Sequence, residues 1–167
     1  AAQVKGGIAE EGLTEPMLGD AVHEVTPAGN IVDSWRSWEH LNVDQDVICF
    51  LEDRYEWTHQ NSLKITSNGS LLVSFRQTST VGIVDRITGE FSWKWGPGEI
   101  SHQHNPTYLD NGHVLIFGNG AHHVEDVQVA QDEQVQAHGR AVVGRIAAGA
   151  HAQRLQVAVD AQGVADH

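Results

Sequence analysis

Short apolar runs alternate with turn residues through the middle of the chain. An Asn-Gly pair stands between the first two apolar runs and a Thr-Gly pair between the last two, and such pairs are typical of tight turns between antiparallel strands. The pattern therefore predicts four successive β-strands joined by hairpins. The runs and the turns between them are 62–65, Asn68-Gly69, 71–75, 81–84, Thr88-Gly89 and 91–95.

An earlier part of the chain shows the same pattern. Runs at 20–25 and 31–35 flank a Pro-Ala-Gly-Asn turn, so we expect another hairpin there. Residues 38–56 are polar and lack alternation, which predicts a loop insertion. We expect this loop to cross one end of the strands and to bring His40 towards the same mouth as His59.

Two segments of the chain repeat one another. The Asn-Gly turns at 68–69 and 111–112 lie 43 residues apart, and the segment from Asn61 aligns with the segment from Asn105. Tandem units of about 40 to 50 residues, each made of a few short strands, are typical of β-propeller blades. A single blade cannot bury both of its faces, so neighbouring blades must stack on it.

The predicted fold is all-β: a partial β-propeller of two to three blades over 19–120, after an irregular segment at 1–18. The composition changes at residue 121. Residues 121–167 contain no aromatic residue and no Ser, Thr, Asn, Lys, Pro, Cys or Met. Nearly all of the remaining types have codons that begin with G or C, which indicates a frameshifted reading of a GC-rich gene; a genuine low-complexity tail is the alternative. We expect this tail to lie outside the propeller and to supply no blade.

Composition excludes several classes of function. The formal net charge is −12, with 22 acidic and 10 basic residues, so the chain repels phosphate backbones and we expect no nucleic-acid partner. No apolar stretch of about 18 residues predicts a membrane span. The first residues lack the basic and apolar pattern of a signal peptide, so the sequence indicates no compartment. The single cysteine, Cys49, excludes an internal disulfide and a cysteine-based zinc site.

Polar residues whose side chains could bind a ligand or take part in catalysis lie where these strands begin and end. His59 precedes one strand, Arg76 ends the next, and a guanidinium beside an imidazole can bind a tetrahedral oxyanion. His102 and His104 form a His-x-His pair, whose rings would share one face of a strand. With His59 they could hold zinc or copper, or one of them could act as a nucleophile or an acid–base group. Each residue could also be an ordinary hydrogen-bonded or surface side chain.

Several motifs resemble the bacterial arylsulfotransferases over about residues 19–122. The order of His-x-Asn, then Ser-x-Arg, then Gln-His is the most specific part of the resemblance. One departure stands in the last segment, where Gly118 replaces an aspartate of the family. The segments that carry the resemblance are Trp57-Thr58-His59-Gln60-Asn61-Ser62, Ser74-Phe75-Arg76, 85–96, Gln103-His104 and Phe117-Gly118-Asn119-Gly120.

The resemblance implies a six-bladed β-propeller that moves a sulfuryl group from an aryl sulfate ester to a phenol, without a nucleotide sulfate donor. It implies His104 as the nucleophile that carries the sulfuryl group. It further implies that His59 and Arg76 hold the sulfuryl oxygens and that His40 is an additional histidine of the site. No cofactor is implied, the partners are small molecules, and the compartment implied is periplasmic or secreted.

The chemistry of sulfuryl transfer agrees with these residue types. Negative charge develops on the equatorial oxygens, so fixed cationic donors stabilise the transition state. A six-bladed ring needs more units than this chain carries, so we expect a truncated gene product whose activity is impaired in isolation. The alternative function is a non-catalytic β-propeller module that binds a ligand.

Overall fold

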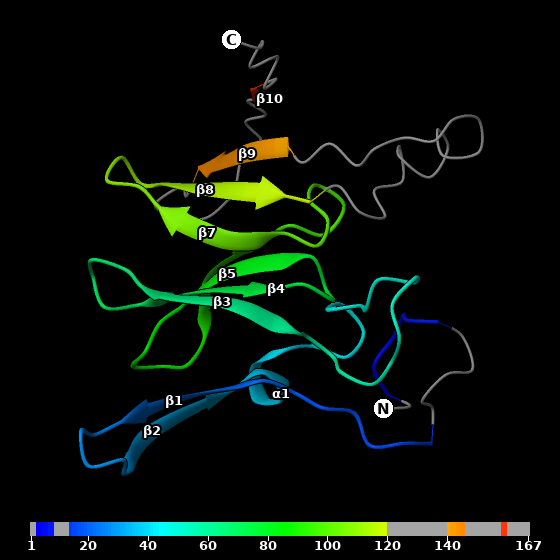
Figure 1. The fold of residues 1–167 in the computed structure, drawn as a ribbon, viewed down its shortest axis with the longest axis horizontal. Coiled ribbons are helices and arrows are strands. Elements are labelled where there is room, and N and C mark those ends of the chain that lie inside the picture. The colour runs from blue at the N-terminus through cyan, green and yellow to red at the C-terminus, as the bar shows by residue number, and fades with distance from the viewer. Residues whose placement is uncertain (1–2, 9–13, 120–139, 146–157, 160–167) are drawn as a thin grey trace, which may run out of the picture.

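The computed structural model describes residues 3–8, 14–119, 140–145 and 158–159. Within these ranges the protein is all-β, with a single short helix (Figure 1). The elements are β1 (Ala21–Val25), β2 (Ile31–Arg36), α1 (Ser37–His40), β3 (Gln60–Ile65), β4 (Leu71–Phe75), β5 (Thr80–Val84), β6 (Phe91–Trp95), β7 (His104–Tyr108), β8 (His113–Gly118), β9 (Arg140–Arg145) and β10 (Ala158–Val159).

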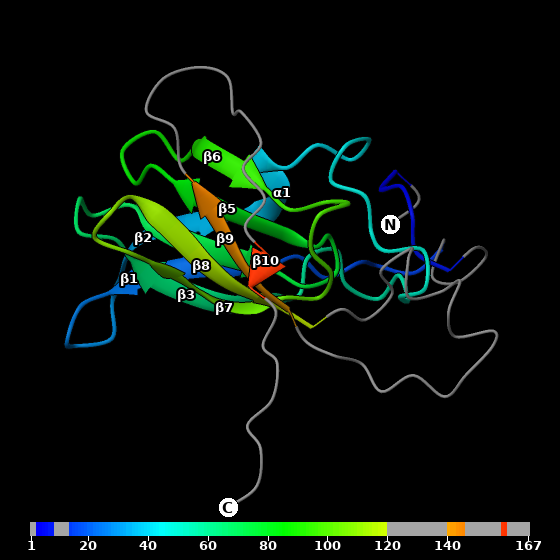
Figure 2. The same cartoon turned by 90° about the horizontal axis from the view of Figure 1, so that it is seen from above.

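The strands form three antiparallel sheets that lie one over another (Figures 1 and 2). The first sheet is the hairpin β1–β2, the middle sheet is β3–β4–β5–β6, and the third sheet is β7–β8–β9–β10. Consecutive strands pair with one another in each sheet. The all-β class and the predicted hairpins are therefore confirmed.

The first hairpin of each sheet turns in the same way. In the middle sheet the amide of Thr66 donates to the carbonyl of Ser70, and the amide of Gly69 donates back to Thr66, both at 2.9 Å. Gly69 has a φ of +85°, a left-handed conformation that favours glycine. The equivalent turns are Thr26–Asn30 and Leu109–His113, with Gly29 and Gly112 also at positive φ. The structure thus contains three copies of this hairpin turn, where the sequence repeat identified two.

The middle sheet is buried on both faces. Every residue of β4 and β5 is buried, although successive side chains point to opposite faces of a strand. Leu72 packs in one core cluster with Val114 and Ile116 of β8. Val73 and Phe75 pack in a second cluster with Trp35 of β2. Neighbouring sheets therefore cover both faces of β4 and β5, the two central strands of the middle sheet.

Residues 121–167 were expected to supply no blade, and this stays a prediction, although two described segments of this region form strands. Strand β9 pairs with β8 over six residues, and β10 pairs with β9. The physical reason is that β8 has an open edge, and backbone pairing at an edge needs neither aromatic side chains nor a tight turn. The rest of this segment lies outside the described residues, so the frameshift hypothesis stays a prediction.

A long loop, residues 41–59, connects α1 to β3 and covers one end of the middle sheet. The structure confirms that the polar segment is largely loop, with α1 at its start. The amide of Cys49 donates to the carbonyl of Gln77 at 2.8 Å, so the loop is fastened to the β4–β5 turn. Residues 3–8 lie along the loop, and the buried Arg54 donates to the carbonyls of Val4 and Gly6. The described residues include no helix that is long and apolar enough to cross a bilayer.

Candidate functional site

The starts of β1, β3 and β7 are joined by hydrogen bonds at one end of the stacked sheets. The carboxylate of Asp20, just before β1, accepts from the amide of Gln60 at 2.8 Å and from the hydroxyl of Thr58. The side-chain amide of Asn61 donates to the carbonyl of Gln103 at 2.7 Å. Residues just before the first strand of each sheet therefore meet at a common edge, which we call the strand-start edge.

Two histidines occupy equivalent places on the strand-start edge. His59 and His102 lie 43 residues apart, the same offset as the two Asn-Gly turns. Both have left-handed backbones, with φ of 50° and 49°, which is uncommon for a residue with a β-carbon. An irregularity in strand register follows each of them, in β3 and in β7. The predicted alignment of Asn61 with Asn105 was therefore one residue out of register, because a constant offset of 43 residues pairs Asn61 with His104. The same constant offset is the sequence signal that pairs His59 with His102.

Arg76 lies beside His59. It follows β4 directly, and its amide donates to the carbonyl of His59 at 3.1 Å. Its guanidinium Nη2 lies 2.9 Å from Oε1 of Glu52, in the long loop. The Arg76 side chain is 26% exposed, so part of the fork faces solvent at the strand-start edge. A backbone hydrogen bond thus holds Arg76, which follows β4, next to His59, which precedes β3, and the sequence predicted these two strands to pair.

Two glutamates of the long loop contact the basic side chains of this edge. Oε1 of Glu56 lies 2.5 Å from Nδ1 of His59, whose side chain is 43% exposed. Oε1 of Glu52 lies 3.4 Å from Nε2 of His102 in addition to its contact with Arg76. Sequence reasoning missed both glutamates, because loop 41–59 has no periodicity that indicates which of its side chains turn inwards.

His104 is exposed at the first position of β7. Its Nδ1 lies 3.1 Å from the carbonyl oxygen of His102 and 2.9 Å from the side-chain nitrogen of Asn119. Two tautomers fit these contacts: Nδ1 accepts from the amide of Asn119 when Nε2 carries the proton, and Nε2 is left with the lone pair when Nδ1 carries the proton and donates to the His102 carbonyl. Neutral His104 in the latter tautomer has the nucleophilic nitrogen on the side away from these two partners.

The expectation that His102 and His104 share one face of a strand is wrong. His102 is 1% exposed while His104 is exposed, because β7 begins only at His104 and His102 has the left-handed backbone. The pair is therefore not arranged as a two-histidine chelate. Among the residues that the structure describes, no three His, Cys, Asp or Glu side chains are grouped so as to hold a metal ion.

Gln103 fixes the backbone between these two histidines. Its side-chain nitrogen lies within 3.1 Å of the hydroxyl of Ser74 and of the carbonyls of Phe75 and Thr80. The residue is fully buried against the middle sheet. The Gln-His pair of the sequence therefore combines a buried anchor with an exposed imidazole.

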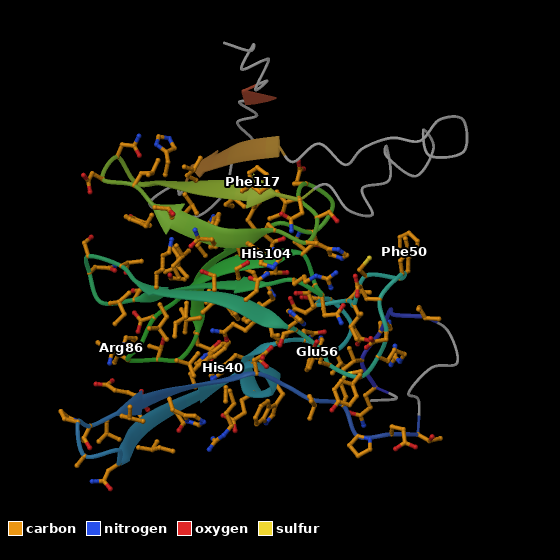
Figure 3. All side chains as sticks on the ribbon, viewed as in Figure 1. His40, Phe50, Glu56, Arg86, His104 and Phe117 are labelled. Atoms are coloured by element: carbon orange, nitrogen blue, oxygen red, sulfur yellow. The ribbon has the colours of Figure 1, made fainter. Side chains whose placement is uncertain are left out.

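The expectation that the loop carries His40 to the mouth of His59 is wrong. His40 stacks on Trp35 at 5.4 Å between ring centroids, and its Nδ1 lies 3.3 Å from Oε1 of Glu90. Glu90 belongs to the β5–β6 turn, at the other end of the middle sheet from Arg76. Figure 3 shows His40 and His104 on opposite sides of the middle sheet. The cause is that the chain leaves β2 through α1, which holds His40 against the aromatic cluster of Trp35.

A cavity of about 460 Å³ lies between the first and middle sheets, near His40 and the β5–β6 turn. Leu71, Val84 and Trp35 are among its apolar lining residues, and Glu24 and Arg86 form an ion pair across it. In the adjoining turn, the amides of Thr88 and Ile87 donate to Asp85 and lower the pKa of its carboxyl. This cavity is separate from the strand-start edge.

Residues 2–101 match the family model described as Arylsulfotransferase (ASST). The match includes His40, His59 and Arg76 and ends before His102 and His104. No curated protein matches the chain significantly. A crystal structure of a protein of unknown function from Bacteroides caccae is similar, with a TM-score of 0.49 and 17% identity, over 87% of this chain and 41% of that one. The chain therefore spans less than half the length of that protein.

Proposed function

The chain belongs to the arylsulfotransferase family, and from that premise we propose that it transfers a sulfuryl group from an aryl sulfate ester to a phenolic acceptor. The observation that carries the proposal is the backbone hydrogen bond that holds Arg76 next to His59, at an edge that also presents His104. We propose His104 as the nucleophile and Arg76 and His59 as donors to the sulfuryl oxygens. His40 has no part in this site.

The arrangement of the sheets supports a β-propeller as the scaffold. We propose that the three stacked sheets are consecutive blades and that β1, β3 and β7 are the first strand of each. Three repeats of one turn and the face-to-face burial of the middle sheet support this assignment. The strand-start edge then corresponds to the rim on which residues of successive blades converge.

The reaction has two steps. The Nε2 lone pair of His104 attacks sulfur, the bond from sulfur to the aryl oxygen breaks, and the phenolate leaves with that electron pair. An acceptor phenol oxygen then attacks the same sulfur, and the N–S bond breaks and returns its electron pair to Nε2. The leaving phenolate gains the proton that the acceptor phenol loses, and a second imidazole of the site can carry it.

Electrostatic stabilisation is the main contribution of the remaining residues. Three equatorial oxygens gain negative charge as the bond to the leaving group breaks. Arg76 presents a planar fork of N–H donors, and such a fork matches two oxygens of a tetrahedral anion at once. In its imidazolium form, His59 donates Nδ1–H to Glu56 and Nε2–H to a further oxygen.

The proposal is tested with 4-nitrophenyl sulfate as donor and phenol as acceptor. We expect phenol-dependent release of 4-nitrophenolate by the full chain and none by His104→Ala. His23→Ala is the matched control, because His23 is an exposed histidine of β1 that bonds only to its hairpin partner Ser34 among the contacts described here. Release that does not need phenol would indicate a sulfatase, and release abolished by a chelator would indicate a metal site. Binding of aryl sulfates without any turnover would favour a ligand-binding module.

A further inference from the structure

Two glutamates four residues apart on the long loop each contact one of the proposed oxygen-binding groups. Glu52 contacts the guanidinium of Arg76 at 2.9 Å, and Glu56 contacts Nδ1 of His59 at 2.5 Å. We propose that Glu52 and Glu56 are positioning residues, which orient Arg76 and His59 towards the sulfuryl oxygens. This inference rests on the proposed function and deepens it.

The loop that carries these glutamates is fastened on both sides of them. The amide of Cys49 donates to Gln77 in the β4–β5 turn at 2.8 Å. The amide of Trp57 donates to the carbonyl of Leu18 at 2.9 Å, and the buried indole of Trp57 donates to the carbonyl of Asp46 at 2.7 Å. The carboxylates are therefore in place before any substrate binds, which is the requirement for a preorganised site.

Glu52 is placed to fix the plane of the Arg76 fork. Its side chain is 14% exposed, compared with 26% for Arg76, so the carboxylate lies on the protein side of the pair. A guanidinium has five N–H donors, and a contact through Nη2 leaves others that can reach a ligand. The same carboxylate oxygen lies 3.4 Å from Nε2 of buried His102, so Glu52 also links the loop to the next unit.

Glu56 is placed to select which nitrogen of His59 meets a substrate. The hydrogen bond at Nδ1 occupies that nitrogen and fixes the plane of the ring. In the imidazolium form, Nε2–H is then the donor available to a sulfuryl oxygen. A carboxylate that orients a functional histidine through its second nitrogen is a common arrangement, and its loss reduces activity by about 10- to 100-fold at metal sites.

The same two carboxylates are expected to favour turnover by orienting Arg76 and His59 but to weaken the binding of an anion. Their negative charge repels sulfate and competes with it for Arg76, which weakens ground-state binding. The positioning role therefore predicts a separation of effects. Glu52→Gln and Glu56→Gln should slow turnover and at the same time leave inorganic sulfate bound as tightly as in the unmodified chain, or more tightly. A purely structural role would weaken both together.

The chain contains matched control pairs at the other end of the middle sheet. Glu24 pairs with Arg86 and Glu90 pairs with His40, so Glu24→Gln and Glu90→Gln remove the same kinds of pair away from the proposed site. We would measure kcat and KM for 4-nitrophenyl sulfate, the Kd of inorganic sulfate and the melting temperature. Site variants should lose about 10- to 100-fold in kcat with no weaker sulfate binding, while the controls keep wild-type kcat.

Double variants test whether the loss of kcat in Glu52→Gln acts through Arg76. In an Arg76→Ala background, Glu52→Gln should cause no further loss, because its effect acts through that guanidinium. Additive losses would overturn the assignment, and so would Glu52→Gln and Glu56→Gln variants with wild-type kcat. Losses of kcat, sulfate binding and melting temperature together would also overturn it.

Failure of the proposed function is recognised separately, as absence of turnover by the unmodified chain. The positioning claim is then decided by NMR of the Arg76 and His59 side chains during titration with inorganic sulfate. Sulfate-dependent shifts that change in Glu52→Gln and Glu56→Gln, but not in the two control variants, would support it. Side-chain signals that are the same in all variants would overturn it.

Discussion

The Nζ of Lys64 donates to Oγ1 of Thr107 at 2.9 Å, and these two residues lie 43 residues apart, at the same place in consecutive units. Lys64 is in β3 and Thr107 is in β7, so the first strands of two sheets lie side by side in register. The same offset relates His59 to His102. Register between units is therefore what brings equivalent residues of successive sheets to one edge.

Burial of the middle sheet predicts where truncation of a side chain destabilises the fold most. Leu72 is fully buried between the middle and third sheets, so Leu72→Ala should reduce the free energy of unfolding by about 2–5 kcal/mol through lost burial and a residual cavity. Leu63 of β3 is 45% exposed, and Leu63→Ala should cost much less. Urea unfolding of both variants measures the difference. Equal losses would show that the two sheets do not pack as described.

The anchor at Gln103 predicts a second loss of stability. Gln103→Ala removes a donor from the hydroxyl of Ser74 and from two carbonyls in a fully buried place, which should cost about 1–3 kcal/mol. Because this side chain fixes the backbone next to His104, turnover should fall as well. Chemical unfolding and kcat of the same variant test both effects. Wild-type stability in Gln103→Ala would contradict the anchoring role.

Arg76 predicts a loss of turnover that charge alone does not restore. Arg76→Lys keeps the positive charge but replaces the planar fork by a single ammonium, so kcat/KM should fall by about 10²- to 10³-fold. Arg86→Lys is the control, because Arg86 forms an exposed ion pair with Glu24 at the other end of the sheet. Steady-state kinetics with an aryl sulfate measures the effect. Full activity of Arg76→Lys would mean that the fork is not used.

The β5–β6 turn predicts a pH dependence of stability. The amides of Thr88 and Ile87 lower the pKa of Asp85 in the folded protein. A lowered folded pKa contributes stability that is present above the unfolded pKa, about 3.9, and is lost as the pH falls through the folded value. Urea unfolding between neutral and acid pH should therefore show a smaller decline in Asp85→Asn than in the unmodified chain. An equal decline in both proteins would show that the Asp85 carboxyl does not contribute to the pH dependence of stability.

Local patterns predicted the strands well, and long-range contacts were the part that they could not predict. The run predicted at 71–75 is β4 with the same bounds, because a short apolar run directly after an Asn-Gly turn strongly favours a hairpin strand. The contact of Arg76 with His59 follows from the pairing of β3 and β4. Glu52 could not be found, because its position depends on how a loop without periodicity folds over a distant turn.

The errors have separate physical causes. A His-x-His pair indicates a shared face only if both residues are in extended conformation, and His102 is left-handed. The position of His40 depends on the short helix α1 and on stacking with Trp35. The sequence pattern of the polar segment predicts neither feature. Strand β9 pairs through its backbone with the edge of β8, a pairing that the composition of residues 121–167 did not indicate.

The most direct test of the account is to locate the sulfuryl group after the chain is mixed with an aryl sulfate in the absence of acceptor. Mass spectrometry of rapidly prepared peptides identifies the residue that carries it. The account predicts one SO₃ group on His104, absent from His104→Ala and removed when phenol is added. A sulfuryl group on any other residue, or turnover by His104→Ala, would contradict it.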